Sequence, residues 1–419
     1  MFDLVSVCKE AKKASKELLV LSEDKINKVL LDSAKLLREN ASKLKEENKL
    51  DLVNAKEKGF SEGFIDRLTL SDKVIESIAL GIEQVAGLTS PVGKVVYGYD
   101  NEFQDIKIEK INVPFGVIGI IFESRPNVTA DAFALTFKTQ NAVILKGGSD
   151  AINSNRALVN VLRQALKAND VNPNAVTLID DTSRETTVNF MKMNSYVDLL
   201  IPRGSAKLIK STLENSTIPI IETGTGNCHV YVDSSADIDM ATEVIFNAKT
   251  QRYSVCNACE SIVIHKDIVN KALPKIANKL LEKCVEIRCD EISYKVIKNY
   301  KYLAKATEED FATEYGDAII SVKVVDDVFE AVEHINANST KHSESIITSD
   351  IKNAEYFLKM IDSSCVYHNA STRFSDGFVF GLGAEIGIST QKLHARGPMG
   401  LEGLVTTKYV VKGNGSIRK

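Results

Sequence analysis

The feature that most constrains the fold is a series of short, continuous apolar runs that begins at Val117. The runs occupy residues 117–122, 142–145, 175–179 and 198–201, and segments with helical periodicity separate them. A strand that is apolar on both faces is covered on both sides, which is typical of parallel α/β sheets. The sequence therefore predicts an α/β fold in which helices flank a buried parallel sheet.

A second set of strand-like runs follows a glycine-rich joint at residues 222–226. These runs include residues 261–264, 319–322 and 345–347 and predict a second α/β domain. Residues 103–113 and 405–411 instead alternate apolar and charged or polar side chains, which is the pattern of half-exposed antiparallel strands. Such strands leave edges that need a partner, so we expect a small β-flap that pairs with another subunit.

These patterns predict a division into domains. A chain of 419 residues is long enough for two or three packed modules. We expect residues 1–97 and 117–225 to form a cofactor-binding domain and residues 226–400 to form a catalytic domain. Residues 98–116 and 401–419 are expected to form the flap, which makes the protein a homodimer or a larger homo-oligomer.

Composition excludes several classes of protein. Hydrophobic residues make up 44% and charged residues 26%, which is ordinary for a folded domain and argues against disorder. The net charge of −4 comes from interspersed residues, so neither a nucleic-acid footprint nor a membrane anchor is expected. Seven cysteines without a leader-like N-terminus indicate reduced thiols, and no apolar run approaches the ~20 residues needed to span a bilayer. We expect a cytoplasmic protein.

One cysteine stands in a chemically suggestive context. The segment Gln251-Arg252-Tyr253-Ser254-Val255-Cys256-Asn257-Ala258-Cys259-Glu260 is polar and precedes a predicted strand, which places Cys256 at the end of an element instead of inside a core. Free cysteines are more often small buried hydrophobes than nucleophiles, so this context alone does not decide the role. Cys256 and Cys259 also form a CxxC pair, but without a second pair we expect no metal site, and a redox dithiol is a weaker reading.

The motifs around this segment point to a known family. Residues 113–119 read Val-Pro-Phe-Gly-Val-Ile-Gly, residues 123–129 read Glu-Ser-Arg-Pro-Asn-Val-Thr, and residues 142–149 read Ala-Val-Ile-Leu-Lys-Gly-Gly-Ser. Further along, residues 202–205 read Pro-Arg-Gly-Ser, residues 366–374 read Val-Tyr-His-Asn-Ala-Ser-Thr-Arg-Phe, and residues 394–402 read His-Ala-Arg-Gly-Pro-Met-Gly-Leu-Glu. In this order and around Cys256, they resemble the aldehyde dehydrogenase superfamily and, within it, the γ-glutamyl phosphate reductase (glutamate-5-semialdehyde dehydrogenase) family, over essentially the whole chain. The resemblance implies an aldehyde dehydrogenase-like α/β fold.

The resemblance also implies catalytic roles. Cys256 matches the reactive cysteine, and Asn127 matches the amide of the oxyanion hole. An amide donor that needs no change of protonation suits the tetrahedral oxyanion that forms when a thiolate attacks a carbonyl. The alternative for Asn127 is that it only caps the turn after Pro126.

Cofactor contacts follow from the same resemblance. Lys146 resembles the lysine that reaches the adenosine ribose, Gly204 and Ser205 resemble the residues beside the pyrophosphate, and Glu314 resembles the glutamate that holds the nicotinamide ribose. Ser149 stands where relatives that prefer NAD tend to carry a glutamate. Without that carboxylate a 2′-phosphate is not repelled, so we expect NADPH and NADP⁺, although the neighbouring Asp150 weakens the argument.

The substrate side is less determined. Glu222 precedes Cys256 at a spacing that resembles the general base of hydrolytic aldehyde dehydrogenases, but a reductase should avoid activating water, so packing or proton handling are alternatives. Candidate ligands for the substrate are Arg125, Asn369, Arg373, His394 and Arg396. For the charged ones, a structural salt bridge is the competing interpretation.

The expected reaction is reduction of L-glutamyl 5-phosphate to L-glutamate 5-semialdehyde through a thioacyl enzyme on Cys256, a step of proline biosynthesis. Two alternatives remain open on the sequence. One is a generic NAD(P)-dependent aldehyde dehydrogenase that releases a carboxylic acid. The other is a non-catalytic binding protein on the same scaffold.

Overall fold

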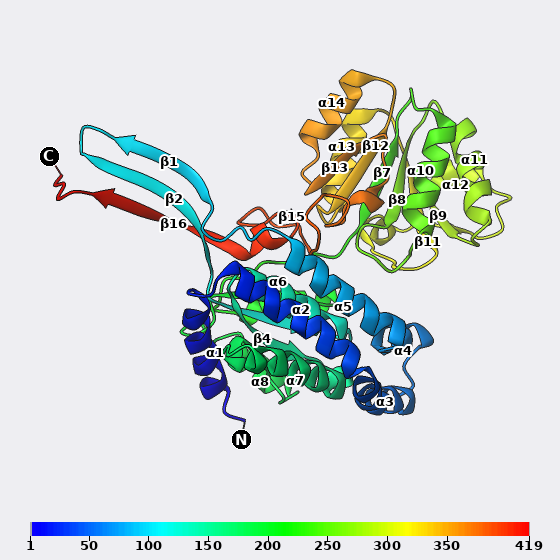
Figure 1. The fold of residues 1–419 in the computed structure, drawn as a ribbon. Coiled ribbons are helices and arrows are strands. Elements are labelled where there is room, and N and C mark those ends of the chain that lie inside the picture. Colours follow the sequence, from blue (N-terminus) through cyan, green and yellow to red (C-terminus); the bar gives the residue numbers. More distant parts are fainter. Residues whose placement is uncertain (1, 419) are drawn as a thin grey trace. The chain divides into compact units, whose positions relative to one another are not determined.

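The computed structural model describes residues 2–418, which divide into two compact units (Figure 1). Among the described residues the first unit comprises 2–222, 381–387 and 399–418. The second unit comprises Thr223–Phe380 and Ile388–Pro398.

A parallel sheet forms the centre of the first unit. Its strands are β3 (Val117–Phe122), β4 (Ala142–Gly147), β5 (Val176–Leu178) and β6 (Leu199–Arg203). They pair in parallel in the order β5-β4-β3-β6. All residues of β3 and β4 are buried, so the continuous apolar runs of the sequence are covered on both faces, as predicted.

Helices cover this sheet. Helix α6 connects β3 to β4 and α7 connects β4 to β5, and α2 and α5 pack against them (Figure 1). Ser22 caps α2 by accepting a hydrogen bond from the Lys25 N–H, and its acidic first turn suits a helix N-terminus. The helices of the first unit are α1 (Leu4–Leu18), α2 (Glu23–Glu39), α3 (Ala41–Glu57), α4 (Glu62–Leu68), α5 (Asp72–Gly87), α6 (Asn127–Lys138), α7 (Ile152–Ala168), α8 (Arg184–Phe190) and α9 (Ala206–Asn215), with the short turns η1 (Ser149–Ala151), η2 (Pro173–Ala175) and η5 (Leu401–Leu404).

An antiparallel flap extends from the first unit beyond its helices (Figure 1). It pairs β1 (Val95–Asn101), β2 (Ile106–Pro114) and β16 (Val405–Gly413) in the order β1-β2-β16. The two alternating segments of the sequence therefore pair with each other, as β2 and β16. The additional strand β1 escaped prediction because almost all of its residues are exposed, so no buried face imposes a period of two.

The second unit is built on a larger parallel sheet. Its strands are β7 (Cys228–Val232), β8 (Cys259–His265), β9 (Glu286–Cys289), β10 (Leu303–Lys305), β11 (Ile319–Val325), β12 (Ser343–Ile347) and β13 (Cys365–His368). They pair in the order β10-β9-β11-β8-β7-β12-β13. This confirms the second predicted α/β domain, whose runs at 261–264, 319–322 and 345–347 are β8, β11 and β12.

Two apolar cores lie on opposite faces of this sheet. Along β8, Ile262 and Ile264 join the core that contains α10 and α11, whereas Val263 joins the core that contains α13 and α14. Successive residues of a strand point to opposite faces, so a strand covered on both sides has no polar face. The helices of this unit are α10 (Ile238–Thr250), α11 (Val269–Leu281), α12 (Glu291–Val296), α13 (Val328–Asn338) and α14 (Ile351–Met360), with η3 (Glu308–Ala312), η4 (Thr372–Phe374) and the paired strands β14 (Ile388–Ser389) and β15 (Gly397–Pro398). None of the helices described in residues 2–418 is long and apolar enough to cross a membrane.

Candidate active site

Cys256 lies in the loop that joins α10 to β8 in the second unit. Its side chain is half-buried, whereas Cys259 begins β8 and is fully buried. Burial raises the pKa of the Cys259 thiol to about 12, which removes it as a nucleophile at neutral pH. No disulfide links the cysteines of the described chain, and residues 2–418 contain no cluster of metal-ligating side chains. The two cysteines of the CxxC pair therefore have different environments.

The glycine-rich joint holds the backbone at Cys256. A Cβ on Gly226 would lie 1.5 Å from the carbonyl oxygen of Cys256, so only glycine allows this approach. The Cys228 thiol donates to the same carbonyl oxygen at 3.2 Å. The peptide of Cys256 is therefore fixed from the joint and from β7.

The cationic side chain of Arg373 lies beside the loop of residues 251–258 that carries Cys256, the candidate nucleophile. The amide of Asn257 donates to the carbonyl oxygens of Arg373 and Ser375, at 3.3 and 2.9 Å, and this joins the loop to η4. The Arg373 Nε donates to Gln251 Oε1 at 2.9 Å. Burial lowers the pKa of Arg373, and the nearby Cys256 opposes that shift. The structure thus brings two predicted site residues, Cys256 and Arg373, into one electrostatic environment, where a guanidinium favours a thiolate or a phosphate.

The other predicted substrate ligands of this unit lie in different surroundings. Asn369 has φ +54° and exchanges two hydrogen bonds with the backbone of Thr348, which ties the end of β13 to the end of β12. Arg396 donates to both the carbonyl and the carboxylate of Asp362, so it has the structural ion pair that was its competing interpretation. His394 is an exposed residue with φ +61° in the segment between β14 and β15. Ligand roles for these three residues stay predictions.

Glu314 lies in the segment between η3 and β11, and its side chain is half-buried. Its neighbour Tyr315 donates through its hydroxyl to Asp310 at 2.9 Å and stacks under the guanidinium of Arg288. Gly316 follows with φ +61°. This turn is therefore rigidly supported next to the predicted ribose ligand.

Asn127 is the first residue of α6 in the first unit. Its amide nitrogen donates to the carboxylate of Asp131, one helical turn later, at 3.0 Å. Burial raises the pKa of Asp131 to about 6, and the hydrogen bond from Asn127 opposes that shift. Asp131 escaped sequence analysis, although its spacing of four from Asn127 is the available signal. Arg125 lies exposed two residues before α6.

The remaining predicted cofactor residues gather at one edge of the first unit's sheet. Strands β3, β4 and β6 are neighbours in parallel register, with Phe122 opposite both Gly147 and Arg203. Lys146, the penultimate residue of β4, therefore lies near the ends of β3 and β6, at the carboxyl edge where α/β sheets bind ligands. Its amine is buried and donates to the Gly147 carbonyl at 3.1 Å; burial lowers its pKa, and Asp181 opposes this shift.

The turn after β6 already holds an anionic group. Ser205 is the N-cap of α9, and its backbone N–H and hydroxyl donate to the Glu123 carboxylate at 2.8 and 3.0 Å. A Cβ on Gly204 would lie 2.6 Å from the same carboxylate. The donors of this helix N-terminus therefore fit an anion, which is what a pyrophosphate requires.

Two other candidates lie in less distinctive positions. Ser149 is exposed at the start of η1, and the adjacent Asp150 pairs with the Lys58 amine at 2.9 Å. Glu222 is half-buried and is the last residue of the first chain segment of the first unit.

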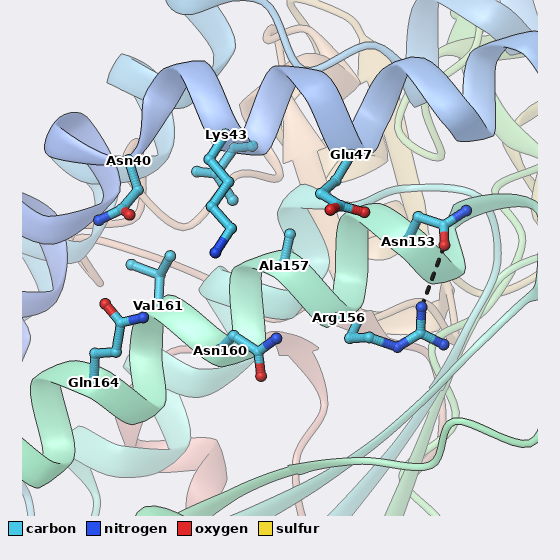
Figure 2. Close-up of a pocket in the computed structure, with 10 residues that line it drawn as sticks. Asn40, Lys43, Glu47, Asn153, Arg156, Ala157, Asn160, Val161 and Gln164 are labelled. Carbon is cyan, nitrogen blue, oxygen red and sulfur yellow. Dashed lines mark hydrogen bonds between the residues drawn. The ribbon is translucent and has the colours of Figure 1, made fainter.

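A separate polar groove lies between α3 and α7 and is lined by residues such as Lys43, Glu47 and Arg156 (Figure 2). None of the predicted site residues lines it.

Comparison with known proteins gives the family. The aldehyde dehydrogenase family model matches residues 3–290. A gamma-glutamyl phosphate reductase from Lachnospira eligens is 57% identical over 98% of both chains, and one from Agathobacter rectalis is 53% identical over 100% of both. The crystal structure of the gamma-glutamyl phosphate reductase from Thermotoga maritima superposes with a TM-score of 0.96 at 44% identity and full coverage of both chains. These matches confirm the predicted fold, and the chain belongs to the aldehyde dehydrogenase family and, within it, to the gamma-glutamyl phosphate reductases.

Proposed function

We propose that this chain catalyses the NADPH-dependent reduction of L-glutamyl 5-phosphate to L-glutamate 5-semialdehyde and phosphate, a step of proline biosynthesis. The observation that carries the proposal is the half-exposed thiol of Cys256 beside the guanidinium of Arg373, in a chain at least half identical to full-length gamma-glutamyl phosphate reductases. A thiol nucleophile with an adjacent cation suits an acyl phosphate, which carries both an electrophilic carbon and a dianionic leaving group.

In this mechanism the Cys256 thiolate attacks the γ-carbonyl carbon of the substrate. A C–S bond forms, the oxyanion accepts a hydrogen bond from the Asn127 amide, and the C–O bond to phosphate breaks, which leaves a thioacyl enzyme. A nicotinamide cofactor, when bound, would supply the hydride that reduces this thioester. The resulting tetrahedral oxyanion collapses, releases the aldehyde and returns the Cys256 thiolate.

For the cofactor, Lys146, Gly204, Ser205 and Glu314 are the proposed binding residues. The support is that a carboxylate already sits on the Ser205 donors and that Lys146 is the penultimate residue of β4, whose carboxyl end lies at the same edge of the sheet. We propose NADPH over NADH because Ser149 brings no carboxylate and because Asp150 is neutralised by Lys58. Equal kcat/KM values for the two cofactors would contradict this preference.

The experiment that tests the reaction runs it in the oxidative direction. With glutamate 5-semialdehyde and NADP⁺, the thioacyl enzyme must be released by phosphate or by water. The proposal predicts NADP⁺ reduction that requires phosphate or arsenate and is negligible without either. Rapid, phosphate-independent formation of glutamate would instead show that Glu222 activates water, and the generic aldehyde dehydrogenase would be the better description.

Substrate contacts follow from the same reaction. Arg373 is the proposed ligand of the phosphoryl group, because Asn257, the residue after Cys256, donates hydrogen bonds to the backbone of Arg373 and Ser375, and because the charge of Cys256 acts on the Arg373 pKa. Arg125, Asn369, His394 and Arg396 remain proposed contacts for the rest of the substrate. Arg373→Gln should raise the apparent KM for phosphate in the oxidative assay, whereas an unchanged KM would remove Arg373 from phosphate recognition.

We further propose that the first unit binds the cofactor, that the second performs the acyl chemistry and that the flap mediates self-association in a cytoplasmic enzyme. The flap's outer strands, β1 and β16, present large exposed apolar side chains, namely Val95, Val96, Tyr97, Tyr99, Tyr409 and Val411. Unpaired strand edges with exposed apolar residues commonly pair with a second chain. Sedimentation of the wild type and of a Tyr97→Lys/Tyr99→Lys variant tests this, and a wild-type monomer would overturn it.

A further inference from the structure

The second unit contains an ion pair that is removed from solvent. Lys249 Nζ lies 2.6 Å from Glu260 Oε2, and both side chains are 0% exposed. Burial raises the pKa of Glu260 to about 7, and Lys249 opposes that shift. Burying two charges has a desolvation cost that well-packed apolar residues of similar size do not have, so a buried ion pair is weak evidence for a stabilising role. The question is then which segments the pair holds in place.

The two partners bracket the nucleophile loop. Lys249 is in the last turn of α10, immediately before the loop, and Glu260 is the second residue of β8, immediately after it. Cys256 lies between them in the chain. The ion pair therefore closes the base of this loop and fixes the distance between its two ends.

The second oxygen of Glu260 reaches a different loop. Glu260 Oε1 accepts a hydrogen bond from the Gly316 N–H at 3.2 Å. Gly316 is two residues after Glu314, and its φ of +61° sets the direction of that turn. One buried carboxylate thus contacts, through Lys249, the helix end from which the loop of Cys256 starts and, through Gly316, the loop that carries Glu314.

We propose that the Lys249–Glu260 pair is a positioning element that locks the loop of Cys256 to the loop of Glu314, so that the thiol and the predicted nicotinamide-ribose ligand keep one fixed geometry. This proposal rests on the proposed function for the role of Glu314, but the link between the loops rests on the contacts alone. Positioning groups matter because a displacement of about 1 Å at a reacting group lowers the rate by about 10²-fold.

The test compares Lys249→Met, Glu260→Gln and the double variant. Glu260→Gln keeps an acceptor for Gly316 and removes the charge, and the double variant leaves no uncompensated buried charge, so it is the variant that should fold even if the single ones do not. The matched control is Lys138→Met, because Lys138 is also 0% exposed and paired, with Glu23, and its hydrogen-bond partners Glu23, Asn27 and Ala86 all belong to the first unit.

Three readouts separate positioning from stability. They are the unfolding midpoint in urea, the dissociation constant of NADPH from fluorescence, and the alkylation rate of Cys256 by iodoacetamide, with the exposed Cys284 as internal reference by mass spectrometry. In the double variant we expect a near wild-type midpoint, Cys256 alkylation about 10-fold slower as the thiolate loses its fixed place near Arg373, and NADPH binding weakened about 10-fold. The kcat should fall by about 10²-fold.

Lys138→Met should lower the midpoint and leave Cys256 alkylation, NADPH binding and kcat unchanged. If the double variant keeps wild-type alkylation, NADPH affinity and kcat, the pair is only structural and the proposal is overturned. Failure of the proposed function would look different, because the wild type itself would then lack phosphate-dependent turnover while the alkylation comparison between variants remained valid.

Discussion

In the second unit the loop around Cys256 is supported by buried groups, whereas in the first unit the candidate pyrophosphate turn at Gly204 and Ser205 makes exposed contacts. Around Cys256, the Gly226 backbone, the Cys228 thiol and the Lys249–Glu260 pair all fix the main chain. At the cofactor edge, Ser205 has an exposed carboxylate as its partner. Covalent chemistry needs a nucleophile held to a fraction of an ångström, while a cofactor that must enter and leave needs donors that are easily exchanged.

The strongest way to break this comparison is to remove the nucleophile. Cys256→Ala should abolish turnover, because the thiol forms the covalent bond, while leaving the affinity for NADPH nearly unchanged. Steady-state assays with fluorescence titration of NADPH measure both. Cys259→Ala is the matched control and should be mild, since this buried thiol has a pKa raised to about 12. An inactive Cys259→Ala with an active Cys256→Ala would reverse the assignment.

The next largest effect on kcat is expected when the side-chain amide of Asn127, in the first unit, is removed. Asn127→Ala should lower kcat by about 10²–10³-fold, the loss typical of one oxyanion-hole donor. Its amide is oriented by a local hydrogen bond to Asp131, one helical turn away, so the fold should survive, and circular dichroism would verify that. A variant with wild-type kcat would leave Asn127 as a structural residue of the α6 N-terminus.

A smaller loss of kcat is expected when the backbone contact between Gly226 and the loop of Cys256 is disturbed. Gly226→Ala would place a methyl group 1.5 Å from the Cys256 carbonyl oxygen, so the loop must shift, and kcat should fall by about 10²-fold. Gly81→Ala in α5 meets no atom within 4 Å and should be neutral or slightly stabilising, which makes it the control. Equal activity of the two variants would show that the joint does not position Cys256.

Sequence analysis predicted those elements whose burial leaves a pattern within their own residues. Continuous apolar runs predicted the four strands of the first parallel sheet, and β8, β11 and β12 of the second, because burial on both faces removes polar residues from them, as in β3 and β4. Strand β1 was missed because burial leaves no pattern on an exposed strand. The family motifs gave Cys256, Asn127 and the Gly204-Ser205 turn as candidate site residues, and their roles stay predictions; the donors of the turn contact a carboxylate in the structure.

Contacts between distant segments could not be read from the sequence. Arg373 was one of several candidate cations, and the hydrogen bonds of Asn257 to the η4 segment and of Arg373 to Gln251 place it beside the loop that carries Cys256. Arg396 looked equivalent in the sequence but is paired with Asp362. The Lys249–Glu260 pair gave no signal, because its partners belong to a helix end and a strand start whose spacing matches no regular period.

The smallest expected effect is a change in NADPH affinity on substitution of Glu123, which contacts the candidate cofactor turn. Its carboxylate occupies the Ser205 donors that the pyrophosphate of a cofactor would need, so it competes with that group and repels its charge. Glu123→Gln removes the charge and leaves a weaker acceptor. Since a charge at a helix N-terminus is worth about 0.3–1 kcal/mol, NADPH should bind about 2–5-fold more tightly to the variant. Screening by salt should shrink the gain in affinity, so titrations at low and high ionic strength give a second check.

The control is Glu62→Gln, in the first turn of α4, which makes the same change of net charge at another helix start and should leave the affinity for NADPH unchanged. Weaker NADPH binding by Glu123→Gln would mean that the carboxylate builds the site, and the contrast between a fixed nucleophile and an exchangeable cofactor turn would then fail.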